Sequence, residues 1–540
     1  MSNLKSLTDV LMAQADRIRR TAIARAIPRV WPGIAERACH RAGLDDTVFA
    51  AAASDFDVAH YQRFAGVRFR SKQDAVFHYL VTGSLQGWEP RAGFSPAVYR
   101  RANPDTAFAG YEPFAHYCRF GRDEGRGGTS EADGAVGSVP APPTLEQILA
   151  RPPPRKEGAR IDVVIPVYGN RHLTLRTIDS VLAAEVRVPF DLIVVDDASP
   201  DPVLAAELRT LAEQGLVSLL VNDTNLGFVH SVNRGLWLHQ DRDVVLLNSD
   251  TTVFGDWLDR LVAVLHGTPR FASATPLSNA ATILSYPIPL QDNNTLPLDY
   301  AALDKICALT NAEPVELPTG VGFCMAIKRE CINEIGGFDT AEFGRGYGEE
   351  NDFCRRAAAK GWRHAAAANV FVWHKGGGSF AEHRERLVAA AQLILERRHP
   401  GYEALVLDFI AIDPLQRVRA QLDAARVAAD PRPKILMLGA VTQGDRSHQD
   451  ALGVQIVPDI GRFWGTYRPR ISQLPGIVNL PRVASGAPVG ALASALRALH
   501  VETMAVSPKG PYTAESTENW IAAARECGVA IVEGSVGVAG

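Results

Sequence analysis

Acidic side chains stand at the ends of apolar runs in this chain, where they could bind a metal ion. Asp196 and Asp197 follow the run LIVV, and Asp250 ends the segment DVVLLNSD. In an open α/β sheet, ligands bind outside the carboxyl ends of the strands, so side chains at these ends share one rim. Neighbouring carboxylates repel one another, and a cation between them relieves the repulsion. Oxygen ligands favour Mg²⁺ or Mn²⁺, so the sequence predicts one of these ions at the rim.

The elements that position these side chains are predicted to be strands alternating with helices. Short runs rich in Val, Ile and Leu lie at 161–168, 191–199, 216–222 and 243–250. Helix-compatible stretches lie at 173–184 and 202–215. Such alternation favours a parallel sheet that is buried on both faces.

The length of 540 residues exceeds what one core usually supports, so we expect two to four domains of about 100–250 residues. The 46% hydrophobic and 21% charged residues are typical of globular proteins and exclude disorder of the whole chain. The predicted parts are a basic helical segment at 1–49, a helical module at 50–126, a linker at 127–158, an α/β domain at 159–400, a helical connector at 401–430 and a second α/β unit at 431–540. The second α/β unit has no GxGxxG or P-loop spacing, and its role is open.

The module at 50–126 contains one internal repeat. Equivalent residues lie 38 positions apart, in the pairs Phe56 and Phe94, Tyr61 and Tyr99, His78 and His116, Tyr79 and Tyr117, Gly83 and Gly121, and Gly87 and Gly125. This spacing predicts two small helical copies stacked on one another. Recurrence of aromatic residues at equivalent positions favours packing, with ligand binding as the alternative.

Charge and cysteine content narrow the function classes. The formal net charge of −4 argues against a general nucleic-acid binder. The seven cysteines are scattered without a CxxC pair, which indicates neither a disulfide framework nor a zinc site and favours a reducing cytoplasm.

No apolar stretch reaches the roughly 18 residues that span a bilayer. The first thirty residues are basic and compatible with an amphipathic helix. Such a helix either packs on its own protein or lies in the plane of a membrane surface. The predicted location is therefore the cytoplasm, and the second alternative adds peripheral contact at the inner face of the cytoplasmic membrane.

Seven motifs occur in a characteristic order between residues 160 and 385. They are VVIPVYGN, VVDDAS, NLGFVHSVNRG, LLNSD, GVGFCMAIKRE, GGFDTAEFGRGYGEENDFCRRAAAKGW and VWHKGGGSF. Together they resemble the family 2 glycosyltransferases, which have the GT-A fold and move a sugar from a nucleotide donor with inversion. The NSD form and the last motif resemble especially the bacterial branch of rhamnosyltransferases and cell-surface polysaccharide enzymes. The fold class implied is α/β, with a Rossmann-like, mostly parallel sheet and helices on both faces, flanked by the repeat module and the small C-terminal unit.

The resemblance implies a set of site residues. Nucleotide-sugar binding is implied for Pro166, Val167, Asp196, Asp197, Asn225, Gly227, Asn233, Arg234, Asn248, Ser249, Glu349 and Lys375. Metal binding is implied for Asp250 and His374. Asn248 replaces the first Asp of the family's DxD motif, which leaves Asp250 as the principal metal carboxylate. For the segment from Asp196 to Ser199, the alternative is a helix N-cap.

Inversion in one step needs a base that takes the proton from the acceptor hydroxyl, and the resemblance places Glu350 in this role. On a helix, Glu349 and Asp352 share one face, and Glu350 is turned about 100° away from Glu349. The alternative is a first helical turn enriched in acids to suit the helix macrodipole.

The function implied is that of a metal-dependent inverting glycosyltransferase with Mg²⁺ or Mn²⁺. The implied donor is dTDP-rhamnose or a UDP-sugar, and the implied acceptor is a glycan or lipid-linked glycan of the bacterial cell surface, such as O-antigen. No nucleic-acid partner is expected, and contacts with the inner membrane or with other glycan-assembly proteins are compatible with this function. Two alternatives stay open: a catalytically silent GT-A domain that binds glycans or acts as a scaffold, and a nucleotidyltransferase. The latter predicts a glycine-rich basic loop after the first strand, which VYGNRH does not match.

Overall fold

The computed structural model describes residues 46–533, with gaps at 66–68, 70, 81–83, 85–88, 97–98, 100–111, 123–141, 159, 291, 295, 297, 311–312, 345, 377–380, 439–450, 459–465, 472–473, 475, 485 and 507–513. The predicted basic helix within 1–49 lies almost wholly outside the described residues, as does the linker up to residue 141. The chain divides into two compact units, one within 1–136, 295–297 and 427–540, and the other within 137–294 and 298–426.

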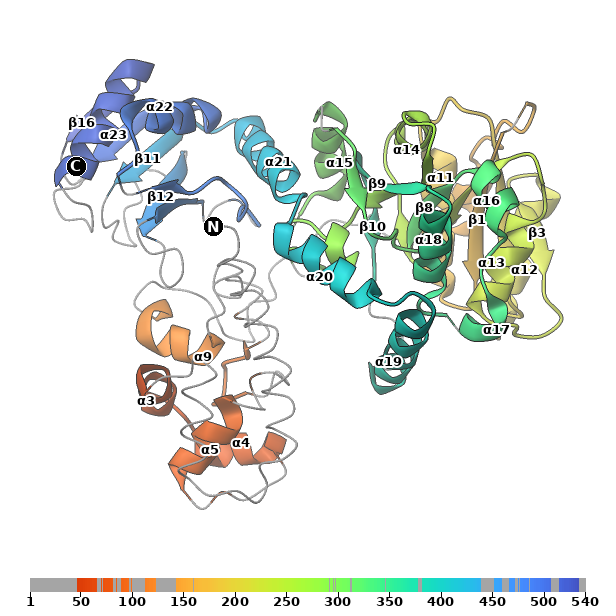
Figure 1. Cartoon of the computed structure of the whole chain (residues 1–540), viewed down its shortest axis with the longest axis horizontal. Helices are drawn as coiled ribbons and strands as arrows, with labels where there is room; N and C mark the ends of the chain where they lie inside the picture. The colour runs from red at the N-terminus through yellow and green to blue at the C-terminus, as the bar shows by residue number, and fades with distance from the viewer. Residues whose placement is uncertain are drawn as a thin grey trace. The chain divides into compact units, whose positions relative to one another are not determined.

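The second unit is built around an eight-stranded sheet with the order β3-β2-β1-β4-β8-β6-β9-β7 (Figure 1). The strands are β1 Ile161–Val167, β2 Phe190–Asp196, β3 Ser218–Val221, β4 Asp243–Leu247, β6 Phe271–Leu277, β7 Val315–Leu317, β8 Cys324–Ile327 and β9 Arg363–Phe371. β1, β2, β3 and β4 are parallel to one another, as are β6 and β9. β8 runs antiparallel to both β4 and β6, and β7 antiparallel to β9. The sheet confirms the predicted α/β class, and the insertion of antiparallel β8 is a feature that the sequence pattern did not reveal.

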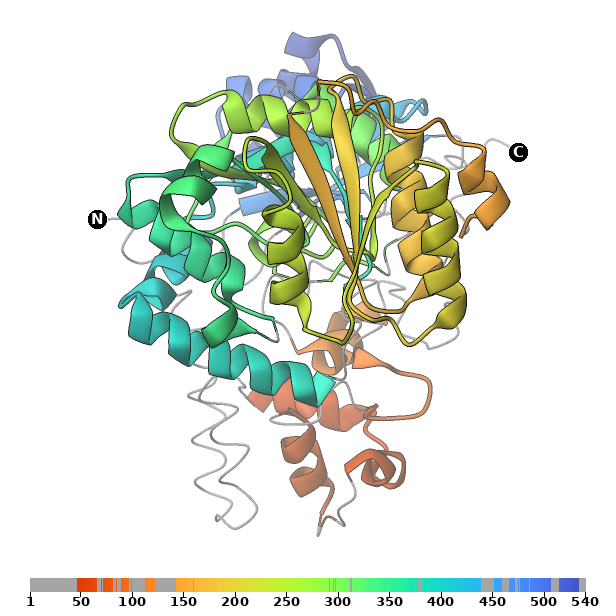
Figure 2. The ribbon, with the colours of Figure 1, turned by 90° about the vertical axis from the view of Figure 1, so that its right-hand side faces the viewer.

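Crossover helices cover both faces of the sheet. α11 (Arg171–Ala183), α12 (Pro202–Glu213) and α13 (Phe228–Leu236) connect the first four strands. Figure 2 shows α11 and α12 on one side of the strands and α13 on the other. Every residue of β1 and β2 is buried, which explains why these strands are continuous apolar runs rather than alternating ones.

The α13 face carries a large apolar core shared with later helices. It joins residues of β1, β2, β4 and β8 to α13, α16 (Arg329–Ile335), α17 (Thr340–Phe343), α18 (Glu349–Ala359) and α19 (Ala381–Arg398). Phe338 and Trp362, both almost fully buried, belong to this core. The packing fixes α18 against the sheet, and α18 begins with the acidic pair predicted to do chemistry.

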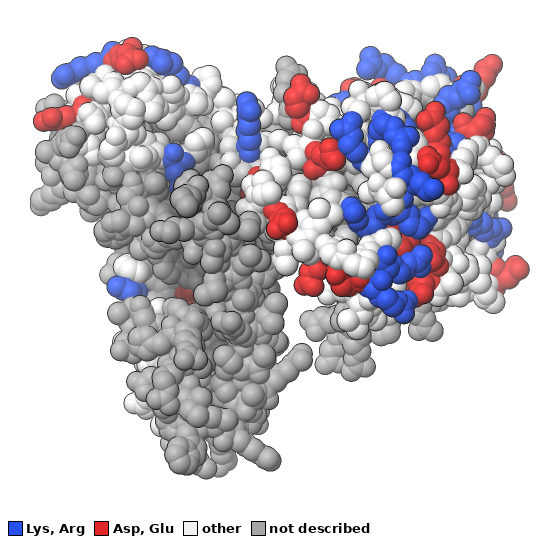
Figure 3. Space-filling view, in the orientation of Figure 1, with Lys and Arg blue, Asp and Glu red and all other residues white. Residues whose placement is uncertain are grey.

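The remaining elements of this unit include α14 (Trp257–His266), which packs against β6, β8 and β9, α15 (Tyr300–Leu309), which packs against β9, and α10 (Leu145–Leu149), which packs against α11. A short antiparallel ribbon pairs β5 (Thr251–Thr252) with β10 (Trp373–His374). Two further helices are α20 Tyr402–Ile412 and α21 Gln416–Ala429, the last of which runs past the end of the unit. Acidic and basic side chains are interspersed on the face of this unit seen in Figure 3.

The two copies of the 38-residue repeat form the same hydrogen bond. Tyr61 Oη lies 2.9 Å from His78 Nδ1, and Tyr99 Oη lies 2.9 Å from His116 Nδ1. The helices here are α3 Asp46–Ser54, α4 Val58–Ala65, α5 Lys72–His78 and α9 Pro113–His116, followed by a π-helical turn at Tyr117–Gly121. A side chain at Gly121 would collide with the Tyr99 hydroxyl, because its Cβ would lie 2.0 Å from that oxygen. The repeated aromatic residues that the structure describes are therefore used for packing.

The C-terminal α/β part contains a six-stranded sheet with the order β14-β13-β12-β11-β15-β16. Its elements are β11 Lys434–Leu438, β12 Leu452–Pro458, β13 Thr466–Arg470, β14 Val483–Ala484, α22 Val489–Ala498, β15 Val501–Val506, α23 Ala514–Cys527 and β16 Ala530–Glu533. The sequence pattern indicated β11, β15, β16 and both helices, whereas it missed β12 and the antiparallel edge strands. Within the residues that the structure describes, none of the helices is both long enough and apolar enough to cross a membrane.

Candidate active site

Asp196 orders the turn after β2. The carboxylate is buried, and its Oδ1 accepts the backbone N–H of Ser199 at 2.9 Å. The Ser199 hydroxyl accepts the N–H of Gly169 at 3.0 Å, which joins this turn to the loop after β1. The helix cap considered as the alternative role is provided instead by Asp201, which accepts the N–H groups of the first turn of α12. Pro166 and the buried Val167 lie beside this turn, at the end of β1, where Val167 pairs with Asp196.

Asp197 shapes the loop before α13. It accepts hydrogen bonds from Asn222 Nδ2 at 2.7 Å, from Leu226 N at 2.8 Å and from Gly227 N at 2.9 Å. Gly227 adopts φ 88°, a conformation that favours glycine, as the chain turns into the helix. The carboxylate is thus engaged within the loop, and this loop presents the exposed Asn225 to solvent.

Asn233 and Arg234 of α13 are engaged elsewhere. Asn233 donates from Nδ2 to the carbonyl of Phe338 at 2.7 Å and accepts the N–H of Phe338 at 2.9 Å. Arg234 donates from Nη1 to the carbonyl of Val221 at 2.6 Å, next to the end of β3. Both side chains tie α13 to its neighbours, and the structure does not bring them to the ribbon that carries Asp250 and His374.

Asp250 and His374 are brought together by the β5–β10 ribbon. His374 pairs with Thr251, and Lys375 donates its N–H to the carbonyl of Asp250 at 2.9 Å. His374 Nδ1 lies 2.7 Å from the carbonyl of Ala280, which can only accept, so Nδ1 carries the proton. His374 Nε2 is left facing Asp250 Oδ1 at 3.4 Å. Imidazole and carboxylate ligands bind divalent metals at about 2.0–2.2 Å, so the two atoms can share one ion.

The surroundings of His374 hold it in this position. Burial lowers the pKa of His374, whereas the hydrogen bond and charge of Asp250 raise it more, so the pKa lies above its ordinary value. Asn279 clamps its backbone, accepting the N–H at 2.9 Å and donating to the carbonyl at 2.7 Å. The ring stacks on Phe323 with centroids 5.2 Å apart. The imidazole is therefore preorganised toward Asp250.

Asn248 and Ser249 join this group at the end of β4. Asn248 donates its N–H to the carbonyl of Phe323 at 2.8 Å, and its own carbonyl accepts from Thr251 Oγ1 at 2.8 Å. Both Asn248 and Ser249 are half-buried beside Asp250. Lys375 is exposed immediately after His374, so its ammonium is accessible to a ligand.

Glu350 packs against the short loop at 320–323, which precedes β8. A Cβ at Gly322 would lie 3.8 Å from three side-chain carbons of Glu350, so the carboxyl stem packs against this glycine. Phe323, the next residue, stacks on His374. The loop at 320–323 therefore links the candidate base to the candidate metal ligands. Glu350 is partly exposed, and burial raises the pKa of its carboxyl.

Glu349 faces the interior, unlike Glu350. Glu349 and Asp352 are buried, as expected for two residues on one helix face. Burial and the charge of Glu350 raise the pKa of Glu349 well above its ordinary value, and its Oε2 is buried without a hydrogen-bond partner. The glycine-rich approach is sterically required, because Gly348 has φ 92° and its Cβ would lie 3.0 Å from the Phe343 ring.

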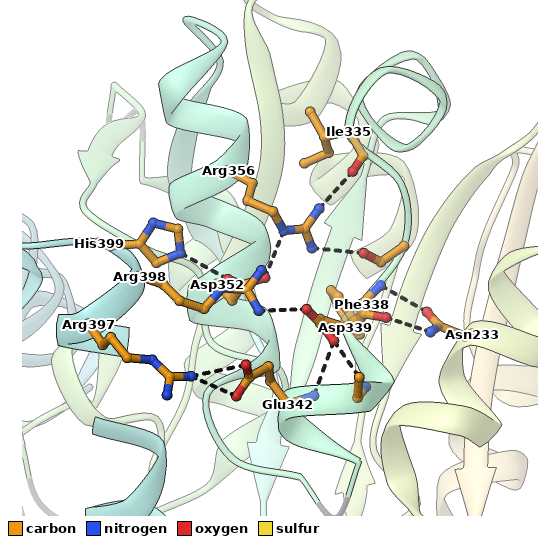
Figure 4. A network of polar contacts seen from close by, with 12 residues as sticks. Asn233, Ile335, Phe338, Asp339, Glu342, Asp352, Arg356, Arg397, Arg398 and His399 are labelled. Atoms are coloured by element: carbon orange, nitrogen blue, oxygen red, sulfur yellow. Dashed lines mark hydrogen bonds and ion pairs between the residues drawn. The ribbon is translucent and has the colours of Figure 1, made fainter. Parts of the chain in front are cut away.

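Asp352 is the centre of an ion-pair network that sequence reasoning missed (Figure 4). Its carboxylate lies 2.7 Å from Arg356 Nε, 3.2 Å from Arg398 Nε and 2.9 Å from His399 Nε2. Arg356 also donates to the carbonyls of Ile335 and Gly337 at 2.7 and 2.8 Å. The network fastens α18 to the end of α19 and its following residue, and so supports the start of α18. The RR and H at 397–399 gave no sequence signal that they belonged beside this Asp.

A second acidic cluster lies at the opposite ends of the strands. One ligand atom each of Asp162, Asp191 and His239 lies within 4.8 Å of the others, a spacing that could hold a metal ion. However, Arg242 Nη1 lies 3.1 Å from Asp162, and Lys156 Nζ lies 2.9 Å from Asp191. These cations already offset the carboxylates, so the cluster is explained as ion pairs.

Part of the chain is similar to known glycosyltransferases. Residues 159–391 match the family model described as glycosyltransferase like family 2. No curated protein is similar enough to count as a match. A structure of GalNAc-T7 with UDP, GalNAc and Mn²⁺ is 19% identical, with a TM-score of 0.32, covering 48% of this chain and 54% of that one. The mannosyltransferase PcManGT from Pyrobaculum calidifontis, in complex with GDP-Man and Mn²⁺, is 19% identical, with a TM-score of 0.35, covering 62% of this chain and 86% of that one.

The chain thus spans about half the length of the first of these two structures. The family match covers the whole run from β1 to β10, including Asp250, His374 and Glu350. The matched segment, residues 159–391, is less than half of the chain, and this segment is similar to the glycosyltransferase like family 2.

Proposed function

We propose that this domain is a metal-dependent inverting glycosyltransferase that uses a nucleotide-diphosphate sugar, either dTDP-rhamnose or a UDP-sugar. The acceptor is a hydroxyl of a bacterial cell-surface glycan or of a lipid-linked glycan. The observation that carries the proposal is the placement of Asp250, His374 and Glu350 around the loop at 320–323. The donor and acceptor classes rest on the sequence resemblance alone.

The side-chain atoms of Asp250 and His374 that face each other are suitable ligands for a divalent cation. Asp250 offers a carboxylate oxygen and His374 offers Nε2, because its Nδ1 is engaged with Ala280. Two protein ligands leave coordination positions open for oxygens of a diphosphate, as suits Mg²⁺ or Mn²⁺. Such an ion, when bound, offsets the negative charge that develops on the leaving diphosphate.

Glu350 is the proposed base. As the acceptor oxygen attacks the anomeric carbon, Glu350 takes the hydroxyl proton, the bond from sugar to phosphate breaks, and the nucleoside diphosphate leaves. The raised pKa of this half-buried carboxyl suits a proton acceptor at neutral pH better than an ordinary exposed carboxylate would. Lys375 is the proposed contact for the donor phosphates, which its exposed position next to His374 supports.

The base is tested by Glu350→Gln in a screen of nucleotide sugars with Mn²⁺ and Mg²⁺. We expect transfer and donor hydrolysis to fall by about 10²- to 10⁴-fold, because the positioned proton acceptor is lost while donor binding remains. Glu330→Gln, at an exposed position on α16, removes the same kind of charge and should leave the rate unchanged. A wild-type chain that neither hydrolyses nor transfers any donor would instead support a silent glycan-binding or scaffold domain, as Asn248 in the DxD position allows.

The metal site is tested by chelation and by Asp250→Asn. We expect EDTA to abolish donor turnover and Mn²⁺ or Mg²⁺ to restore it. Asp250→Asn should raise the metal concentration needed for half-maximal activity by about tenfold or more, because a neutral ligand replaces the only carboxylate of the pair. Asp241→Asn, at an exposed loop position, is the matched control. Undiminished turnover of the wild type in EDTA would contradict metal dependence.

We further propose that the protein acts in the cytoplasm, peripherally at the inner face of the cytoplasmic membrane or beside other glycan-assembly proteins, and without a nucleic-acid partner. The support is the acceptor class together with the basic sequence at 1–49.

A further inference from the structure

A cavity of about 280 Å³ lies beside α11, lined also by residues on either side of α10 and by β5 and the loop that follows it. Its lining includes Arg176 and Ser180 of α11, Thr252 of β5, and the pair Arg151 and Asp179. Successive side chains of a strand point to opposite faces. Thr252 pairs with Trp373 and Thr251 pairs with His374, so the Thr252 side of the ribbon is the one turned away from the candidate metal site.

Arg176 brings an uncompensated cation to this cavity. One face of its guanidinium lies over the Trp373 ring, 5.6 Å from the centroid. Within the described part of the chain, no carboxylate forms an ion pair with Arg176, and its buried Nε has no hydrogen-bond acceptor. Burial lowers the pKa of Arg176, and no nearby charge offsets this effect. The guanidinium is half-buried, so it loses part of its hydration without a compensating charge, and a bound anion would supply that charge.

Thr252 contributes an independent observation. Its side chain is 3% exposed, and its Oγ1 is buried without a hydrogen-bond partner. The other polar groups of the lining are satisfied: Ser180 Oγ donates to Thr177 and accepts from Val253, and Arg151 binds Asp179 at 2.8 Å. The groups without partners are thus a guanidinium N–H and a hydroxyl, both of which can donate.

We propose that this cavity binds a small oxyanion, the phosphate or carboxylate group of a sugar-sized ligand, through Arg176 and Thr252. Unpartnered donors call for a ligand rich in acceptors. The charges of Arg151 and Asp179 offset each other, which leaves the lining with the net positive charge of Arg176. The volume lies just below the range of about 300–1,000 Å³ that is usual for ligand pockets, which suits a small ligand. This site is separate from the proposed donor site and does not depend on the proposed function.

The test is a calorimetric titration of the full chain in EDTA, so that metal-mediated binding at Asp250 and His374 does not contribute. The probes are inorganic phosphate, glucose 6-phosphate and glucuronate, with glucose as the neutral control. We expect at least one anion to bind and glucose to bind more weakly. Binding of the two phosphates alone identifies a phosphate ligand, and binding of glucuronate alone identifies a carboxylate; either result supports the site.

The variants locate the binding. Arg176→Gln should lower the affinity for the anion by about tenfold or more, because a charged hydrogen bond is lost. Thr252→Val, which keeps the shape of the side chain, should lower the affinity for the anion several-fold. This variant remains informative if Arg176→Gln does not fold. Arg209→Gln, at an exposed position of α12, removes the same charge and should have no effect. Absence of binding by every anion, or equal binding by the wild type and Thr252→Val, would overturn the proposal.

Discussion

Two adjacent carboxyl groups at the start of α18 lie in different surroundings. Glu350 is partly exposed beside Gly322, whereas Glu349 is 5% exposed and its Oε2 has no partner. The helical phase accounts for the difference, because neighbouring residues on a helix point about 100° apart. Only Glu350 is therefore accessible to an acceptor hydroxyl, while Glu349 affects the site through its charge and its packing.

Glu349 should make the stability of the protein depend on pH. Its pKa in the folded state is raised by burial and by Glu350, above an ordinary value of 4.5. The unfolded chain therefore releases this proton first, so the free energy of unfolding falls as pH rises from about 4.5 toward the raised folded-state pKa. Glu349→Gln removes the ionisable group and with it the fall in the free energy of unfolding, so we expect the variant to be more stable than the wild type at neutral pH.

Urea unfolding at several pH values measures this effect. The advantage of Glu349→Gln should shrink toward pH 4, where the carboxyl is protonated in both states. Glu330→Gln, whose carboxyl is exposed, serves as the reference. A Glu349→Gln advantage that does not change with pH would show that packing rather than ionisation is responsible.

At the scale of elements, the position of α18 depends on what holds its first turns. The ends of β4 and β8 and the β5–β10 ribbon support the metal ligands, whereas Glu350 of α18 packs against Gly322 in the loop at 320–323. The buried Asp352 ties the helix to Arg356, Arg398 and His399 (Figure 4). Packing in the α13-side core and this ionic network act together to hold Glu350 in place.

Asp352→Ala should destabilise the second unit by about 3–5 kcal/mol, because it leaves partly buried cations without their partner. The matched control is Arg363→Ala, which breaks the exposed pair with Glu316 at 3.4 Å and should cost about 0–1 kcal/mol. Urea unfolding monitored by tryptophan fluorescence gives both values. Equal losses for the two variants would mean that the Asp352 network contributes no more than a surface ion pair.

At the scale of the whole molecule, the chain separates the candidate chemistry from its flanking parts. Every candidate site residue, from Pro166 to Lys375, belongs to the unit within 137–294 and 298–426. The repeat module has an apolar core built from residues near one another in the sequence, and the C-terminal part forms a six-stranded sheet from strands within 434–533. The flanking parts therefore supply none of the groups assigned here to donor binding or proton transfer.

A fragment of residues 142–430 should fold and retain most of the donor hydrolysis of the full chain, because it keeps the eight-stranded sheet and all candidate site residues. Circular dichroism and a hydrolysis assay compare the fragment with the intact protein. A folded fragment without hydrolysis would show that a flanking part is required for the site to function.

The sequence by itself determined the local framework of the domain. Runs such as 161–168 and 243–250 identified β1 and β4, because strands buried on both faces must be apolar throughout. The phase of the helix at 349–359 followed from its period, and the repeat followed from its constant spacing. These features depend on residues close in the chain.

Tertiary structure alone decided which polar groups meet. Asn233 lies in the motif NLGFVHSVNRG, for which the resemblance implied nucleotide-sugar binding. In the structure, its side chain instead donates a hydrogen bond to the carbonyl of Phe338, 105 positions away. Asp352 meets His399, 47 positions away, and the antiparallel β8 enters the sheet between β4 and β6. The same holds for Asp250 and His374, which meet because β5 pairs with β10. The physical reason is that a side chain's partner depends on how distant segments pack, and local patterns of hydrophobicity do not specify this.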